Sequence, residues 1–194
     1  MSVYMIPRLA VLLSGNGSNL QAMIEAIEAK KLLAKIVVVM SNKPDAYGLV
    51  RAQTAHIPTH ILESKLYPTR EQYDDALKEL LLPYQPDLII FSGFMRIVSK
   101  VFVDAFEGRI LNLHPSLLPK YPGLNTYQRA IEAGDREHGS TVHIVTAELD
   151  AGPIILQRKV PIFSEDTSET LKQRTQKMEY ELYPEAIKCF LSKR

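Results

Sequence analysis

The sequence lacks the features of a secreted or membrane-bound protein. It contains one cysteine, Cys189, so no internal disulfide can form, and this is typical of a reducing compartment. The apolar start MSVYMIPRLAVLLSG has neither the basic segment nor the cleavage site of a signal peptide. It is also shorter than the roughly 20 residues that span a membrane. We therefore expect a cytoplasmic protein without a membrane partner, in which Cys189 is a structural thiol.

An excess of charge of one sign is also absent. Lys and Arg together number 23 and Asp and Glu 22, which gives a net charge of +1. Nucleic-acid-binding proteins usually show a clear basic excess or a run of basic residues, and neither is present. We predict no nucleic-acid partner. The 194 residues, 46% of them hydrophobic, are enough to bury a full core without disulfides or metals.

Apolar runs and helical patterns alternate along the chain. Runs rich in β-branched residues predict strands, and apolar residues at helical spacing predict helices. The expected strands are 8–13, 36–40, 59–62, 87–92, 109–113, 140–147 and 153–160, and the expected helices are 19–31, 46–55, 70–82, 99–106, 126–133 and 168–191. This alternation predicts an α/β fold with a mostly parallel twisted sheet, helices on both faces and an antiparallel C-terminal strand pair.

The loop Ser14-Gly-Asn-Gly-Ser-Asn19 lies between the first strand and the first helix. Ligands of open parallel sheets bind beyond the carboxyl ends of the strands, which directs attention to loops 14–19, 92–98 and 112–123. Two glycines allow a tight turn, and a helix N-terminus favours an anion. The third glycine of a dinucleotide fingerprint is replaced by Leu20, and no Walker lysine follows. We predict a site for a terminal phosphate, with Ser18 and Asn19 as candidate helix caps; the plain alternative is a tight turn.

A second group of polar residues lies at the end of the strand predicted at 109–113 and just beyond it. Asn112 and His114 are two residues apart, so an extended strand turns them to the same side, and Pro115 stops the strand. An amide can stabilise an oxyanion while an imidazole handles protons. Asp150, at the corner between the last two strands, is the candidate carboxylate that orients the ring. The structural alternatives are a core histidine and two turn residues.

Two other kinds of chemistry are less well supported by the sequence. No Ser or Cys lies in a nucleophile elbow, so the attacking group should belong to the substrate. His138 and His143 are five residues apart, and His56 and His60 are four apart across a loop without the Glu of a zinc-protease motif. We assign these four histidines to structural or solvent roles, with a metal site as the alternative, and we predict no metal.

Four segments in this order resemble the phosphoribosylglycinamide formyltransferase family, which acts in purine synthesis. They are SGNGSN at 14–19, GFMRIV at 93–98, NLHPSLLPKYPG at 112–123 and HGSTVHIVTAELDAGPII at 138–155. The resemblance covers about residues 8–190. It implies a Rossmann-like formyltransferase domain over residues 1–194, with a phosphate-binding half at about 1–105 and a folate and catalytic half at about 106–194. It also implies a transfer of the formyl group of 10-formyltetrahydrofolate to the amine of 5-phosphoribosylglycinamide.

The resemblance implies a role for each residue that matches the family's motifs. Asn112 would stabilise the oxyanion, His114 would act as general acid, and Asp150 would tune His114. The residues implied for the phosphoribosyl substrate are Gly15, Asn16, Gly17, Ser18, Asn19, Gln176, Lys177, Met178 and Glu179. Those implied for the folate are Arg70, Met95, Arg96, Ile97, Val98, Asn112, Thr146, Ala147, Glu148, Leu149 and Asp150.

One position departs from the residue common among relatives, and the length of the chain bears on which relative it matches. Tyr127 stands where many relatives carry a histidine. The length leaves no room for the RNA-binding domain of methionyl-tRNA formyltransferases, and the early first strand leaves none for the regulatory domain of formyltetrahydrofolate hydrolases. The partners should be small molecules only, and the protein a monomer or weak homodimer. The alternatives are a formyltetrahydrofolate hydrolase and a non-catalytic nucleotide-binding module.

Overall fold

The computed structural model describes residues 5–193, and its backbone divides into two compact units between Leu111 and Asn112. Seven strands follow the hydrogen-bonded order β3-β2-β1-β4-β5-β6-β7. The fifth strand, β5 (Ile110–His114), has residues in both units. The predicted α/β fold, mostly parallel with an antiparallel C-terminal strand pair, is confirmed.

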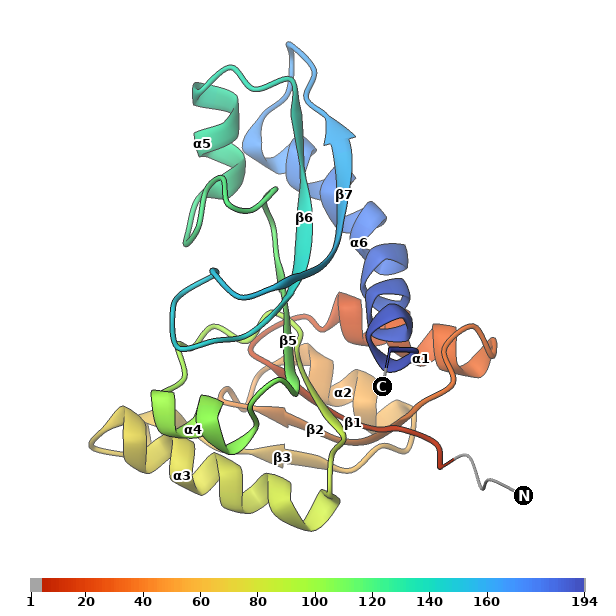
Figure 1. The fold of residues 1–194 in the computed structure, drawn as a ribbon, viewed down its shortest axis with the longest axis vertical. Helices are drawn as coiled ribbons and strands as arrows, with labels where there is room; N and C mark the ends of the chain where they lie inside the picture. The colour runs from red at the N-terminus through yellow and green to blue at the C-terminus, as the bar shows by residue number, and fades with distance from the viewer. Residues whose placement is uncertain (1–4, 194) are drawn as a thin grey trace. The chain divides into compact units, whose positions relative to one another are not determined.

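The first unit is built on four parallel strands, β1 (Arg8–Leu13), β2 (Lys35–Ser41), β3 (Thr59–Ile61) and β4 (Leu88–Phe91). From Leu9 to Leu13 every residue of β1 is fully buried, as expected for a strand with neighbours on both sides and cover on both faces. The helices of this unit are α1 (Ser18–Glu28), α2 (Tyr47–Thr54), α3 (Arg70–Leu81) and α4 (Lys100–Ala105). Helix α1 packs beside α2, and α3 beside α4 (Figure 1).

The second unit contains the antiparallel pair β6 (Glu137–Ile144) and β7 (Ile154–Pro161), with α5 (Thr126–Glu132) and α6 (Ser168–Leu191). Helix α6 runs alongside both strands (Figure 1). The bounds of α6 agree with the prediction, but β6 begins three residues before the expected 140–147. Glu137 is an exposed start for a strand, and its carboxylate lies 2.8 Å from Lys159 Nζ on β7, so a search for apolar runs misses it.

Local signals set the ends of several helices. Thr69 caps α3 by accepting from the Gln72 amide, and Thr167 and Thr170 form a capping box at the start of α6. Helix α3 gives way to a 3₁₀ turn at Leu82–Tyr84, because Pro83 has no amide hydrogen for the α-helical pattern. Within residues 5–193, no helix has both the length and the apolar character needed to cross a bilayer.

Candidate active site

Strand β5 carries Asn112 and His114 two residues apart, so the pleat of the strand turns both side chains to one side. His114 is 6% exposed and Asn112 is half-buried. The strand ends at His114 because Pro115 cannot donate to a sheet ladder. The predicted common orientation of these two side chains agrees with the strand that the structure forms.

Asp150 lies next to His114, as the predicted catalytic group requires. His114 Nδ1 is 3.3 Å from Asp150 Oδ2, and the Asp150 side chain is 8% exposed. On the other side of the ring, His114 Nε2 is 2.9 Å from the carbonyl oxygen of Tyr121. An acceptor therefore faces each ring nitrogen, and a protonated ring can donate through both at once.

The loop that carries Asp150 has a constrained backbone. Asp150 adopts φ 51°, a left-handed conformation that Asp tolerates better than most residues. Its Oδ2 also accepts a hydrogen bond of 2.9 Å from the Gly123 amide. A Cβ on Gly152 would lie 1.7 Å from the Ile144 carbonyl oxygen, so only glycine fits there. The loop therefore places the carboxylate through backbone geometry.

His143, for which the sequence predicts a structural or solvent role, belongs to the same group. Burial lowers the pKa of His143, so the ring is neutral near pH 7. Its Nδ1 lies 3.0 Å from the Ile144 carbonyl oxygen and carries the hydrogen, which leaves Nε2 as an acceptor. Asn112 Nδ2 lies 3.3 Å from that Nε2. His143 thus orients the Asn112 amide so that its second N–H remains available to a substrate oxygen.

No motif in the sequence marks His143 for this role. It lies at an irregularity in the β6–β7 register between Val142 and His143, which no apolar pattern reveals. Its Nε2 is 3.8 Å from Asp150 Oδ1, too far for a hydrogen bond. The contact with Asn112 is therefore the hydrogen bond that links His143 to this group.

The group can stabilise a developing oxyanion and move a proton. An amide N–H and an imidazole beside a carboxylate suit addition of a nucleophile to a carbonyl carbon. Ser116, the nearest hydroxyl along the chain, is fully buried and donates to the Lys120 carbonyl oxygen at 2.6 Å. Because this hydroxyl is occupied, the geometry agrees with a nucleophile supplied by the substrate.

The loop at 14–19 is shaped by close backbone packing. Gly17 has φ 72°, and a Cβ there would lie 2.6 Å from the Gly48 Cα on α2. Gly17 is also the N-cap of α1, without a side-chain hydrogen bond. The expectation that Ser18 or Asn19 caps the helix is therefore wrong, because these are already helical residues. The loop presents a helix N-terminus whose first amides have no side-chain acceptor at the N-cap.

Arg51 on α2 is a second residue that the sequence does not mark as part of a site. Its Nε and a terminal nitrogen lie 2.9 Å from the carbonyl oxygen and the Oδ1 of Asn16. This contact fixes the middle of the loop and places a positive charge beside it. Both features suit a phosphate ligand. The sequence does not predict a role for Arg51 here, because it is 35 residues from Asn16 along the chain and belongs to no motif.

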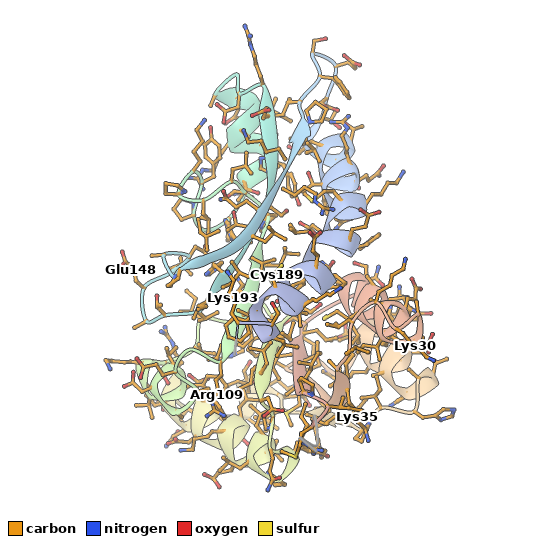
Figure 2. The ribbon with its side chains drawn as sticks, turned by 45° about the vertical axis from the view of Figure 1, so that its right-hand side comes forward. Lys30, Lys35, Arg109, Glu148, Cys189 and Lys193 are labelled. Carbon is orange, nitrogen blue, oxygen red and sulfur yellow. The ribbon has the colours of Figure 1, made fainter. Side chains whose placement is uncertain are left out.

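The remaining predicted residues lie on several elements of the two units. Arg70 is the first residue of α3, and residues 95–98 lie between β4 and α4. Residues 146–149 form the loop after β6, from which Glu148 extends outward (Figure 2). Glu179 on α6 is buried and accepts 2.6 Å from the Ser140 hydroxyl. Cys189 lies near the end of α6 and is half-buried (Figure 2).

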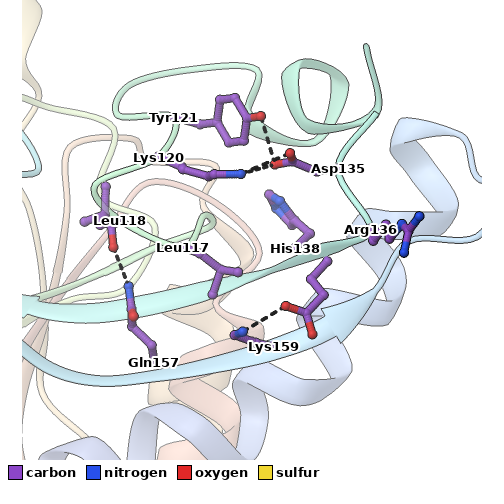
Figure 3. A pocket seen from close by; sticks show the side chains of 10 residues that line it. Leu117, Leu118, Lys120, Tyr121, Asp135, Arg136, His138, Gln157 and Lys159 are labelled. Carbon is purple, nitrogen blue, oxygen red and sulfur yellow. Dashed lines mark hydrogen bonds and ion pairs between the residues drawn. The ribbon is translucent and has the colours of Figure 1, made fainter. Parts of the chain in front are cut away.

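A cavity of about 610 Å³ in the second unit contains none of the predicted site residues. It lies against residues 117–121 and strands β6 and β7 (Figure 3). Lys120 Nζ and the Tyr121 hydroxyl both bind the Asp135 carboxylate at its wall, at 3.0 and 2.9 Å. The same two bonds hold the segment whose Tyr121 carbonyl faces His114.

Known proteins resemble this chain over nearly its whole length. The sequence model of the formyl transferase family matches residues 7–187. The phosphoribosylglycinamide formyltransferase of Haemophilus influenzae is 53% identical over 94% of this chain and 86% of its own length, and that of Escherichia coli K12 is 50% identical over the same shares. The glycinamide ribonucleotide transformylase 1 of Symbiobacterium toebii has a TM-score of 0.96 and 43% identity, covering 100% of this chain and 93% of that one.

Proposed function

The chain belongs to the formyl transferase family, and from this we propose that it transfers the formyl group of 10-formyltetrahydrofolate to the amine of 5-phosphoribosylglycinamide. The products are formylated phosphoribosylglycinamide and tetrahydrofolate, and the reaction belongs to purine synthesis. The observation that carries the proposal is the meeting of His114 with Asp150, beside an Asn112 amide that His143 orients.

The proposed reaction is a direct transfer without a covalent enzyme intermediate. The substrate amine attacks the formyl carbon, and the carbonyl oxygen gains negative charge. Asn112 donates its free amide N–H to that oxygen. His114 acts as the general acid through Nε2, with the substrate replacing the Tyr121 carbonyl oxygen as its partner. Asp150 holds the ring through Nδ1. Collapse of the tetrahedral intermediate breaks the bond to the folate nitrogen, which takes a proton from His114 and leaves as tetrahydrofolate. The proton that the attacking amine loses restores the acid.

The two substrates are assigned to the predicted residues. We assign the phosphate to the loop from Gly15 to Asn19, supported by the helix N-terminus and by the charge of Arg51. Residues Gln176 to Glu179 on α6 are assigned to the rest of this substrate. The folate is assigned to Arg70, to Met95 through Val98 and to Thr146 through Asp150. A cytoplasmic location, small molecules as the only partners, a monomer or weak homodimer, and chemistry without a metal remain part of this proposal.

The test is a spectroscopic assay of tetrahydrofolate release with and without phosphoribosylglycinamide. The substitutions His114→Asn and Asp150→Asn should each lower kcat by about a hundred- to a thousandfold, the usual cost of losing such a group. Asn tolerates the left-handed backbone of residue 150, so the loop should keep its shape. His56→Asn, at an exposed histidine with φ 56°, is the matched control and should leave kcat unchanged.

The same assay separates the alternatives. Rapid formate release from the folate alone would identify a hydrolase. Phosphoribosyl-substrate binding without any formyl transfer would identify a binding module. Normal turnover in both the residue 114 and residue 150 variants would contradict the catalytic assignment.

A further inference from the structure

The segment from residue 94 to residue 99 connects β4 to α4 and has no regular secondary structure. It contains Met95 and Ile97, which are 69% and 55% exposed and therefore accessible to a ligand. Because the segment belongs to neither a helix nor a strand, its position depends on side-chain contacts. Three such contacts come from distant parts of the first unit.

Asp74 on α3 binds the C-terminal end of the segment. Its Oδ2 accepts from the Ser99 amide at 2.5 Å, and both residues are buried, Asp74 with 2% of its surface exposed. Burial raises the pKa of Asp74, while the Ser99 hydrogen bonds and the charges of Arg96 and Arg70 act in the opposite direction. A buried carboxylate is costly unless it is hydrogen-bonded. The hydrogen bond from the Ser99 amide offsets part of this cost, and it ties Asp74 to a residue whose hydroxyl also caps α4.

Tyr73, the preceding residue of α3, binds the middle of the segment. The Arg96 guanidinium lies 4.2 Å from the centre of the Tyr73 ring. The tyrosine is 1% exposed, and its hydroxyl has no hydrogen-bond partner among the described residues. The ring face, rather than the hydroxyl, is therefore the feature in use.

Ser14 binds the N-terminal end. Its hydroxyl oxygen accepts from the Met95 amide at 2.8 Å and donates to Asn42 Oδ1 at 2.6 Å. The Ser14 amide donates to the Gly93 carbonyl oxygen at 3.1 Å. The segment is thus held at both ends, by the start of loop 14–19 at one end and by α3 at the other.

We propose that Tyr73 and Asp74 are positioning residues for folate binding: they hold Arg96 and the Ser99 amide, and so set the backbone of Met95 to Val98 against the folate. This inference rests on the proposed function, because it takes that segment as part of the folate site. It assigns a role to two buried residues on α3 that lie outside the four motif segments and do not react with the substrate.

The experiment measures KM for each substrate separately in four variants. Asp74→Ala removes the acceptor of the Ser99 amide and should raise KM for 10-formyltetrahydrofolate about tenfold or more, as expected for a lost hydrogen bond to a charged group. Asp74→Asn keeps an acceptor and should raise it less. Tyr73→Leu removes the ring face and should raise the same KM by about threefold to tenfold. Tyr73→Phe keeps the ring and should leave it unchanged.

In all four variants, KM for phosphoribosylglycinamide should stay within about twofold of the unmodified value. The matched control is Asp75→Ala, one residue along the same helix, where an exposed carboxylate pairs with Lys78 at 3.0 Å. It should change neither KM. Thermal unfolding of each variant reports whether the fold is retained. If a larger change prevents folding, Asp74→Asn still tests the inference, because a smaller rise in the folate KM is expected from it, and an unchanged folate KM would then contradict the role of Asp74.

Folded Asp74→Ala and Tyr73→Leu variants with an unchanged folate KM would overturn the inference. An equal rise in both KM values would overturn it too, because it would indicate general loosening of the first unit. The unmodified chain tests the proposed function by itself. If it transfers no formyl group, that proposal fails, whereas a normal unmodified chain with unaffected variants defeats only the present inference.

Discussion

Gly17 shows how much one residue can constrain a binding loop. Its φ of 72° is unfavourable for other residues, and the approach of Gly48 leaves no room for a Cβ. Gly15, two residues earlier in the same loop, is exposed, and a Cβ there would have no other atom within 4 Å. Of the two glycines of the SGNGSN motif, the structure therefore requires glycine at 17, whereas a Cβ at 15 would meet no neighbouring atom.

This difference predicts opposite outcomes for one substitution. Gly17→Ala should lower the free energy of unfolding by about 1–3 kcal/mol, as is usual for strained backbone, and should weaken binding of phosphoribosylglycinamide. Gly15→Ala should leave stability within about 0.5 kcal/mol. Denaturant unfolding and calorimetric titration of the substrate check both. Equal stability of the two variants would show that the contact between Gly17 and Gly48 does not constrain the loop.

An ion pair between Asp166 and Arg174 stabilises the start of helix α6. Asp166 precedes the cap, and its two oxygens accept from the two terminal nitrogens of Arg174 at 2.7 and 2.8 Å. The Phe163 amide and the Thr170 hydroxyl also bind this carboxylate. Hydrogen bonds from Arg174 first, and from the other donors next, hold the pKa of Asp166 well below its usual range.

The depressed pKa gives a pH dependence with a defined sign. The contribution of Asp166 is fully present above the unfolded pKa of about 4, and it is lost as the pH falls toward the lower folded pKa. Asp166→Asn should therefore reduce the free energy of unfolding by about 1 kcal/mol at pH 7 and by much less near pH 2. Urea unfolding at both pH values measures this, with Glu165→Gln as the exposed neighbouring control. A loss that is independent of pH would contradict the ion-pair explanation.

For the molecule as a whole, stability depends mainly on the buried strands. Leu12 on β1 is fully buried, whereas Leu33 is 74% exposed. Leu12→Ala leaves a cavity in a close-packed core and should cost about 2–5 kcal/mol, while Leu33→Ala should cost about 0.5 kcal/mol or less. Urea unfolding of the two variants compares the same change in chemistry at two levels of burial. Similar losses would mean that β1 does not lie at the centre of the first unit's core.

The order of the amino acids was enough to predict the elements of the fold, and it supplied the candidate site residues. Strand β1 was predicted with its observed bounds because a strand buried on both faces is a continuous apolar run, and α6 because helical spacing is a local pattern. Asn112 and His114 were selected because they lie two residues apart at the end of a strand, and Asp150 because it is a carboxylate at the corner between two strands. The single-domain organisation stays a prediction, alongside the two compact units of the backbone.

The side chains that support that site emerge only once the chain is folded. His143 contacts Asn112 across 31 residues, Arg51 contacts Asn16 across 35, and Asp74 contacts Ser99 across 25. Such pairs leave no periodic or compositional trace, because a hydrogen bond depends on distance and direction in space and not on separation along the chain. The capping expectation for Ser18 and Asn19 failed because α1 already begins at Ser18, with Gly17 as its N-cap.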